Sequence, residues 1–399
     1  PIRVTPLKIE KGQEANPVVT DFFVLIHREG KFSAGERYEL VFTAKQLPAR
    51  DPAIMLERMI MKKILRSAPE DLRDETEKNL IKAGTNRSEL ISAMTEIENE
   101  YLPGMSFLIA NMPYDDLISL SKSFLLENTR LAYKAWKRCP WSKQIPEQQF
   151  LQYILPYAHL NERRDNWRED FMTRFGPSAW KHESLSDALK EINDTISAEL
   201  NVTYSATNRP KADQSPYESM EAHFASCTGL SILLADACRS VGIPARIAGV
   251  PLWLDESGNH NWVEVFDQRW FNVGSSGSDP RDPDWVNEKC RTNCVPGKPQ
   301  HSVYSAVTRK TDLYFPLVWD PGLTYVPALD ITRFYTNPKE TRIKIPGKEE
   351  ALVTVYWKDE IVARLKGREK VLVTLADKEK YLVEIKTADG KLKRSKLKL

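Results

Sequence analysis

Apolar residues in the first half of the chain recur at the spacing of an amphipathic helix. Several such stripes run through residues 48–180, and six apolar side chains keep one register over residues 185–200. A period of about 3.6 residues predicts helices whose apolar faces pack into a core. Ahead of them, an apolar run and an alternating segment predict a β-hairpin. We therefore expect an N-terminal β segment at residues 1–47, followed by a helical region.

The second half of the chain changes to the two-residue period of β-strands. Residues 245–254, 260–266 and 270–273 predict three strands joined by turn clusters. Further on, four short alternating segments separated by charged turns predict a small C-terminal β-sandwich. A polar turn places this sandwich at residues 337–399 and the preceding core at residues 181–336. The whole pattern is typical of an α+β protein.

Composition narrows the classes of function. The chain has 399 residues, more than one compact core usually holds, so two or three domains are expected. A net charge of +2 gives no electrostatic reason to bind nucleic acid or an anionic membrane. No apolar run approaches the ~18 residues of a membrane span. The 5 cysteines are too few, and odd in number, for a disulfide-stapled scaffold.

Cys290 and Cys294 are closely spaced in a basic loop. A tetrahedral metal site needs four ligands, and no second pair of cysteines accompanies these two. We expect two free thiols, with a local disulfide as the alternative. We expect no metal and no other cofactor.

Cys227 stands at the predicted start of a helix. It follows Ser226 and precedes an apolar stripe over residues 230–241, which Gly242 and Pro244 end in the usual order. Free N–H groups and the positive end of the helix dipole favour a thiolate at such a position. Because the thiolate is the reactive form, Cys227 is a candidate nucleophile.

His260 opens the second of the strands predicted after this helix. A strand that pairs back toward the helix start would bring its imidazole to the sulfur of Cys227. A nucleophile and a base within hydrogen-bond reach are the minimum for thiol catalysis. The donors to an oxyanion would be the backbone N–H of Cys227 and one upstream group.

This part of the sequence resembles the transglutaminase-like superfamily of papain-like thiol enzymes. The resemblance rests on residues 226–229, 241–246, 259–265 and 269–270. It implies a papain-like core in a large bacterial multidomain member. It also implies that Cys227 is the nucleophile and His260 the general base. Trp262, Glu264 and Trp270 would be structural parts of the motif.

The third member of the triad is where this chain departs from the family. The family usually places an Asp near the end of the strand that holds Trp270, and that position is Gly274 here. Asp279, in the Gly/Ser-rich loop that follows, is one candidate for orienting the imidazole. Asn272 is the alternative, since an amide serves in Cys-His-Asn sites. On a third interpretation no orienting residue survives, and the site is weak or inactive.

The resemblance implies a thiol-dependent amide hydrolase. Such a peptidase or amidase would form an acyl-enzyme on Cys227 and act on a peptide, protein or glycopeptide. A protein-glutamine acyltransferase (a transglutaminase) would use the same intermediate and is an alternative. A catalytically inactive binding protein on the same fold is a further alternative, motivated by Gly274.

Two more expectations concern partners and location. The C-terminal β domain is expected to stabilise the main body, with carbohydrate or protein contact as its alternative role. The chain starts at Pro1 without a Met, which a removed signal peptide or trimming would explain. Together with the bacterial members that the resemblance suggests, this start favours an extracytoplasmic protein, either periplasmic or secreted.

Overall fold

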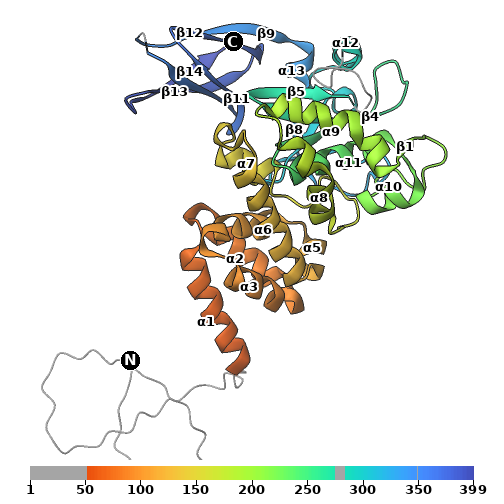
Figure 1. Cartoon of the computed structure of the whole chain (residues 1–399), viewed down its shortest axis with the longest axis vertical. Coiled ribbons are helices and arrows are strands. Elements are labelled where there is room, and N and C mark those ends of the chain that lie inside the picture. Colours follow the sequence, from red (N-terminus) through yellow and green to blue (C-terminus); the bar gives the residue numbers. More distant parts are fainter. Residues whose placement is uncertain (1–51, 275–283, 348) are drawn as a thin grey trace, which may run out of the picture. The chain divides into compact units, whose positions relative to one another are not determined.

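The computed structural model describes residues 52–274, 284–347 and 349–399. The chain divides into two compact units, Pro1–Arg58 and Met59–Leu399. The β-hairpin predicted near the N-terminus lies outside the described residues. The second unit is α+β, with a helical region, a mixed core and C-terminal antiparallel sheets (Figure 1). Among the described residues, no helix is both long enough and apolar enough to cross a membrane.

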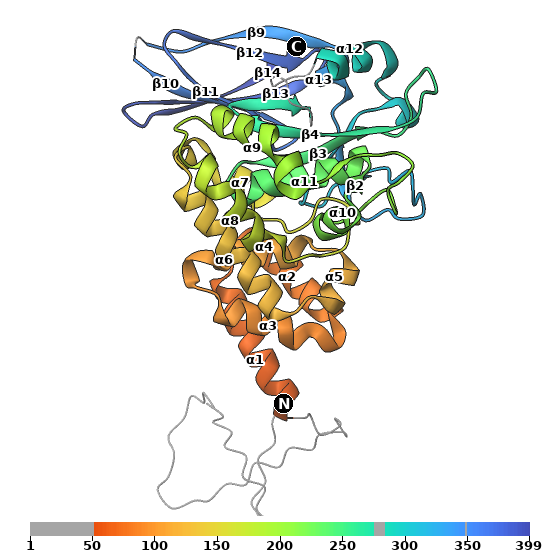
Figure 2. The ribbon, with the colours of Figure 1, turned by 45° about the vertical axis from the view of Figure 1, so that its right-hand side comes forward.

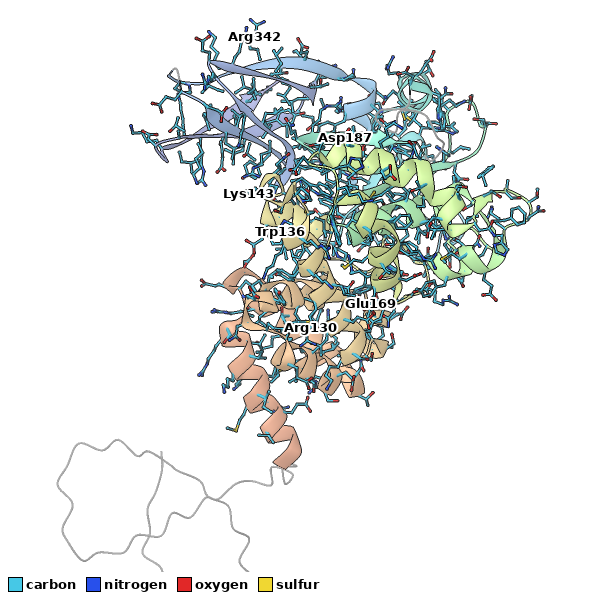
Figure 3. All side chains as sticks on the ribbon, viewed as in Figure 1. Arg130, Trp136, Lys143, Glu169, Asp187 and Arg342 are labelled. Carbon is cyan, nitrogen blue, oxygen red and sulfur yellow. The ribbon has the colours of Figure 1, made fainter. Side chains whose placement is uncertain are left out.

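The helical region follows the apolar spacing of the sequence. Its α-helices are α1 (Pro52–Ser67), α2 (Glu70–Lys82), α3 (Arg87–Glu96), α4 (Leu102–Asn111), α5 (Tyr114–Ser119), α6 (Lys122–Arg138), α7 (Glu147–Tyr153) and α8 (Trp167–Ala179). Short 3₁₀ turns are η1 (Gly84–Asn86), η2 (Asn99–Tyr101) and η3 (Ser142–Gln144). Aromatic side chains fill the interior, as predicted. Trp136 of α6, labelled in Figure 3, stacks on the buried Phe150 of α7 with 4.2 Å between ring centroids.

The core packs helix α11 (Cys227–Ser240) against a sheet. The nearest strands are β3 (Ala245–Val250), β4 (His260–Asp267) and β5 (Arg269–Val273), which pair antiparallel. On one face of the sheet, Val263 and Val273 share a core with Leu233 and Leu234 of the helix. On the other face, Trp262 belongs to a separate apolar cluster. Figure 2 shows α11 lying along β3 and β4. A hydrogen bond from Asn261 to Thr228 places the start of the helix near the start of β4.

The other core elements surround this helix and sheet. They are α9 (Leu185–Leu200), β1 (Thr203–Tyr204), α10 (Pro216–Ala222), β2 (Phe224–Ala225), α12 (Asp284–Asn293), η4 (Pro299–His301), β6 (Tyr304–Ala306), β7 (Leu313–Tyr314), β8 (Pro327–Asp330) and α13 (Thr332–Thr336). Helix α9 has the predicted bounds, since Ser184 caps its start and Asn201 ends it with a left-handed φ of 53°. Helices α8 and α9 also pack on α11, which is therefore buried on most sides.

The C-terminal region consists of antiparallel sheets. Its strands are β9 (Pro338–Lys344), β10 (Ala351–Trp357), β11 (Glu360–Gly367), β12 (Lys370–Ala376), β13 (Lys380–Thr387) and β14 (Leu392–Lys398). Strands β9 and β12 form a two-stranded sheet, and alternating side chains from both sheets share one apolar cluster. The other four strands extend the core sheet, because β11 pairs with β5 at Ala363 and Arg269. The result is a sheet of 10 strands in the order β14-β13-β10-β11-β5-β4-β3-β6-β8-β7.

Candidate active site

Cys227 is the first residue of α11, and the residues around it set up that position. Ser226 caps the helix, because its Oγ accepts a hydrogen bond from the backbone N–H of Gly229 at 3.0 Å. Gly229 lets the first turn approach β2 closely, since a Cβ at this position would lie 2.9 Å from the Cβ of Ala225. The side chain of Cys227 is half-buried at the helix N-terminus, where free N–H groups favour negative charge.

His260 begins β4 and lines the same cavity as Cys227. This cavity has a volume of about 180 Å³ and is also lined by Trp285 and Gly274. The centroid of the His260 ring lies 5.9 Å from that of Trp262 and 4.9 Å from that of Trp285. Burial lowers the pKa of His260 to about 4, so the imidazole is neutral at neutral pH. A neutral imidazole that shares a cavity with a thiol has the protonation state of a general base.

Two hydrogen bonds tie the start of β4 to the first turns of α11. The Nδ2 of Asn261 donates to Oγ1 of Thr228 at 2.7 Å, and both side chains are buried. The Oγ of Ser231 donates to the backbone carbonyl of Asn261 at 3.3 Å. Because Asn261 follows His260 and Thr228 follows Cys227, these bonds fix the two candidate residues relative to one another. Sequence reasoning missed this contact, since neither residue type marks a partner on another element.

Further along β4, a buried polar cluster surrounds Glu264. Its Oε2 accepts from Nε of Arg246 at 2.7 Å, and its Oε1 accepts from the hydroxyl of Tyr335 at 2.6 Å. That hydroxyl also accepts from Nε1 of Trp262 at 2.9 Å. The guanidinium of Arg246 lies 3.8 Å over the ring of Trp270. Trp262, Glu264 and Trp270 thus contribute hydrogen bonds and packing to the sheet that positions His260.

Arg246 and Tyr335 were not predicted as partners of Glu264. The strand register offered a signal for Arg246, which stands directly opposite Glu264 on the antiparallel strand β3. Nothing local marks Tyr335, which reaches Glu264 from α13, 71 residues later. Burial and the charge of Glu264 raise the pKa of Tyr335 well above its usual range, so its hydroxyl keeps the proton that it donates.

The structure separates the candidates for the third catalytic position. Gly274, where the family usually has Asp, follows β5 and lines the cavity of Cys227 and His260. Asn272 stands opposite Glu264 in the strand register and lines a different cavity, so the structure does not bring it to His260. Asp279 lies outside the described residues. Cys227, His260 and Gly274 therefore meet at one cavity, without Asn272.

All 5 cysteines of the chain are free thiols, including the closely spaced Cys290 and Cys294. Both of these are buried, on α12 and just after it. The hydrogen bond between the two thiols, together with burial, raises the pKa of Cys290 far above its usual range. In the part of the chain that the structure describes, no group of three or more His, Cys, Asp or Glu side chains is placed to hold a metal ion.

Parts of this chain are similar to solved structures, whereas none of the curated proteins matches it. The crystal structure of a “Putative Cysteine Protease” from Cytophaga hutchinsonii aligns with 28% of this chain at 22% identity and a TM-score of 0.23. The structure of red sea bream transglutaminase aligns with 65% of this chain at 9% identity and a TM-score of 0.33. The chain covers 37% of the first structure and 65% of the second. Among protein families, residues 177–275 match the transglutaminase-like superfamily, and this part of the chain is a domain of that superfamily.

Proposed function

We propose that this chain is a thiol-dependent amide hydrolase, a peptidase or amidase, with Cys227 as nucleophile and His260 as general base. One observation carries the proposal. The half-buried thiol at the start of α11 and the neutral imidazole at the start of β4 line the same cavity. The superfamily domain supports it, because thiol enzymes are frequent in that superfamily and their substrates are in general peptides or proteins.

The proposed reaction has two halves. As Sγ of Cys227 attacks the amide carbonyl, the neutral ring of His260 takes the thiol proton. The backbone N–H of Cys227, free at the helix N-terminus, donates to the developing oxyanion. The imidazolium then returns its proton to the leaving amine, which departs and leaves an acyl-enzyme. Water, deprotonated by His260, hydrolyses the thioester and releases a carboxylic acid and the thiol.

Asp279 is our candidate for the residue that orients His260. It follows Gly274 by five residues in the sequence. A carboxylate at this position would hold the ring by one nitrogen and stabilise the imidazolium that forms during attack. Its proposed role rests on the sequence alone, because Asp279 lies outside the described residues.

The acid limb of the pH profile should lie well below the ordinary histidine pKa of about 6.5. Hydrolysis needs the neutral form of His260, and burial lowers the pKa of this residue to about 4. The active form is therefore lost only as the pH falls toward that value. Measuring kcat/KM across the acid range, with thermal unfolding at each pH as the control, checks this. A limb centred on the ordinary value would contradict a His260 whose pKa is lowered by burial.

Replacing Thr228 with valine should slow turnover about tenfold and leave KM nearly unchanged, because orientation of the reacting groups weakens. Valine keeps the shape but removes the hydroxyl that accepts from Asn261. Thr228→Ser retains a hydroxyl and should retain activity. Steady-state kinetics of both variants measures the difference. Equal losses in the two variants would argue against a role for the hydrogen bond.

The function itself is tested with a library of peptides derived from a whole proteome. The chain and its Cys227→Ala variant are incubated with the library, and products are identified by mass spectrometry. Parallel samples contain an added primary amine. We expect cleaved peptides with new carboxylates from the unchanged chain alone, in equal amounts with and without the amine.

Two outcomes would replace this proposal with one of its alternatives. Incorporation of the amine into peptides at the expense of cleavage would indicate an acyltransferase, because both reactions start from the same acyl-enzyme. No difference between the chain and Cys227→Ala would contradict the hydrolase and favour the catalytically inactive binding protein.

A further inference from the structure

A second cavity lies on the opposite face of the sheet from Cys227. Glu264 and Asn272 line it, whereas their neighbours Val263 and Val273 line the Cys227 cavity. The two cavities share no lining residue, so they are separate spaces. The second cavity has a volume of about 280 Å³. That is close to the lower end of the range for small-molecule sites, about 300 to 1,000 Å³.

Asn272 supplies an unused hydrogen-bond donor in this cavity. Its side chain is 2% exposed. Its Nδ2 is buried without a hydrogen-bond partner. A buried amide group normally has a partner, because leaving one unpaired costs free energy. A ligand with an acceptor oxygen would remove this cost.

The acidic residues of the cavity are already neutralised by partners. Glu264 accepts from Arg246 and Tyr335. Glu360 accepts from Tyr153 at 2.8 Å and from Arg309 at 3.0 Å. Burial raises the pKa of Glu360, which further limits its negative charge.

Among the described residues that line the cavity, arginines outnumber glutamates. The lining includes three arginines and two glutamates: Arg246, Arg269, Arg291, Glu264 and Glu360. Arg291 projects from α12 and is exposed, so its guanidinium can reach a ligand at the opening of the cavity. A carboxylate would suit both this guanidinium and the amide donor of Asn272, since charge-assisted hydrogen bonds are the stronger ones.

Aromatic side chains form the apolar part of the wall. Trp270, Phe334 and Trp357 all line the cavity. The rings of Phe334 and Trp357 meet edge to face, with 5.1 Å between centroids, so their position is fixed. A flat apolar ring packs against such a wall better than a fully hydrated ion does.

We propose that this second cavity binds a small aromatic carboxylate. Its acidic group accepts from Asn272 and Arg291, and its ring lies against Trp270, Phe334 and Trp357. The site is distinct from the Cys227 cavity and does not depend on the proposed hydrolase activity.

Phenylacetate is a suitable probe, with phenylacetamide as the neutral control of the same shape. Isothermal titration calorimetry and the shift in unfolding temperature measure binding to the full chain. We expect phenylacetate to bind and phenylacetamide to bind at least about tenfold more weakly, because the amide lacks the charge. Alkylating Cys227 beforehand should leave the affinity for phenylacetate unchanged.

Three variants locate the site. Arg291→Gln should weaken phenylacetate binding about tenfold through loss of a charge-assisted bond. Asn272→Asp should abolish binding, because a second carboxylate would repel the first. Lys298→Gln, which removes an exposed charge in the segment that follows α12 and lies outside the cavity, should have no effect. Arg291 is on the surface, so its variant keeps the proposal testable even if Asn272→Asp fails to fold.

Three results would overturn the proposal. The first is equal binding of phenylacetate and phenylacetamide, or binding of neither at millimolar concentration. The second is an affinity that Arg291→Gln leaves unchanged. The third is loss of binding after alkylation of Cys227, which would place the ligand in the other cavity.

Discussion

Cys227→Ala is expected to lower kcat/KM for amide hydrolysis by at least about 10⁴-fold, the scale seen when a nucleophile is removed. Alanine cannot form the acyl-enzyme, so both halves of the proposed reaction are lost. The side chain of Cys227 is half-buried and lines a cavity, which makes the substitution mild for folding. Thermal unfolding should confirm that the variant is as stable as the unchanged chain to within about 1 kcal/mol.

The other cysteines provide the control for this experiment. All four are buried, whereas Cys227 is not. Burial raises the pKa of Cys139 to about 12 and that of Cys238 well above its usual range, so these thiols are poor nucleophiles. Cys294→Ala should therefore retain full activity, even if its unfolding temperature falls. A Cys227→Ala variant with more than about 1% of the activity would contradict the assigned nucleophile.

Glu264→Ala is expected to destabilise the fold by about 3–5 kcal/mol, the effect of removing one partner of a buried ion pair. The side chains of Arg246 and Glu264 are each only 5% exposed. Removing the carboxylate leaves a buried guanidinium without its counter-charge and takes the acceptor from Tyr335. Urea unfolding measures the loss, provided that the transition is cooperative in both proteins.

Glu96→Ala is the matched control for the buried pair. Glu96 pairs with Lys122 at 2.7 Å, as close as the buried pair, but the side chains of Lys122 and Glu96 are 36% and 51% exposed. Surface ion pairs contribute about 0–1 kcal/mol, so this variant should unfold almost normally. A Glu264→Ala variant no less stable than Glu96→Ala would show that the cluster around Glu264 is not structural.

Local patterns predicted the elements of the core well. The apolar register of residues 185–200 gave the observed bounds of α9, and the alternation of residues 260–266 gave all but the last residue of β4. The signal for α9 depends on one buried face, which gives an apolar residue every three or four positions. Strand β4 is instead buried on both faces. The apolar stripe over residues 230–241 predicted one buried face for α11. The helix is buried on more sides than that, because α8 and α9 pack on it in addition to the sheet.

Contacts between distant segments left little trace in the sequence. Strand β11 pairs with β5 at Ala363 and Arg269, and this pairing joins the C-terminal strands to the core sheet. Neither residue type indicates the edge of a sheet. The residue types of Asn261 and Thr228 likewise did not predict the hydrogen bond between them. By contrast, motif and strand order together did place Cys227 and His260 at one cavity. Strand alternation also carries the information that Asn272 shares a face with Glu264.

The rate at which iodoacetamide alkylates Cys227, followed against pH by peptide mass spectrometry, tests the central claim most directly. We predict rapid labelling of the unchanged chain well below the ordinary thiol pKa of about 8.5, and a loss of at least about tenfold in His260→Ala. Asp279→Ala should also slow labelling, whereas Asn272→Ala should not, because Asn272 lines the other cavity. Labelling that follows an ordinary thiol and is indifferent to His260 would contradict the catalytic pair and leave a binding protein.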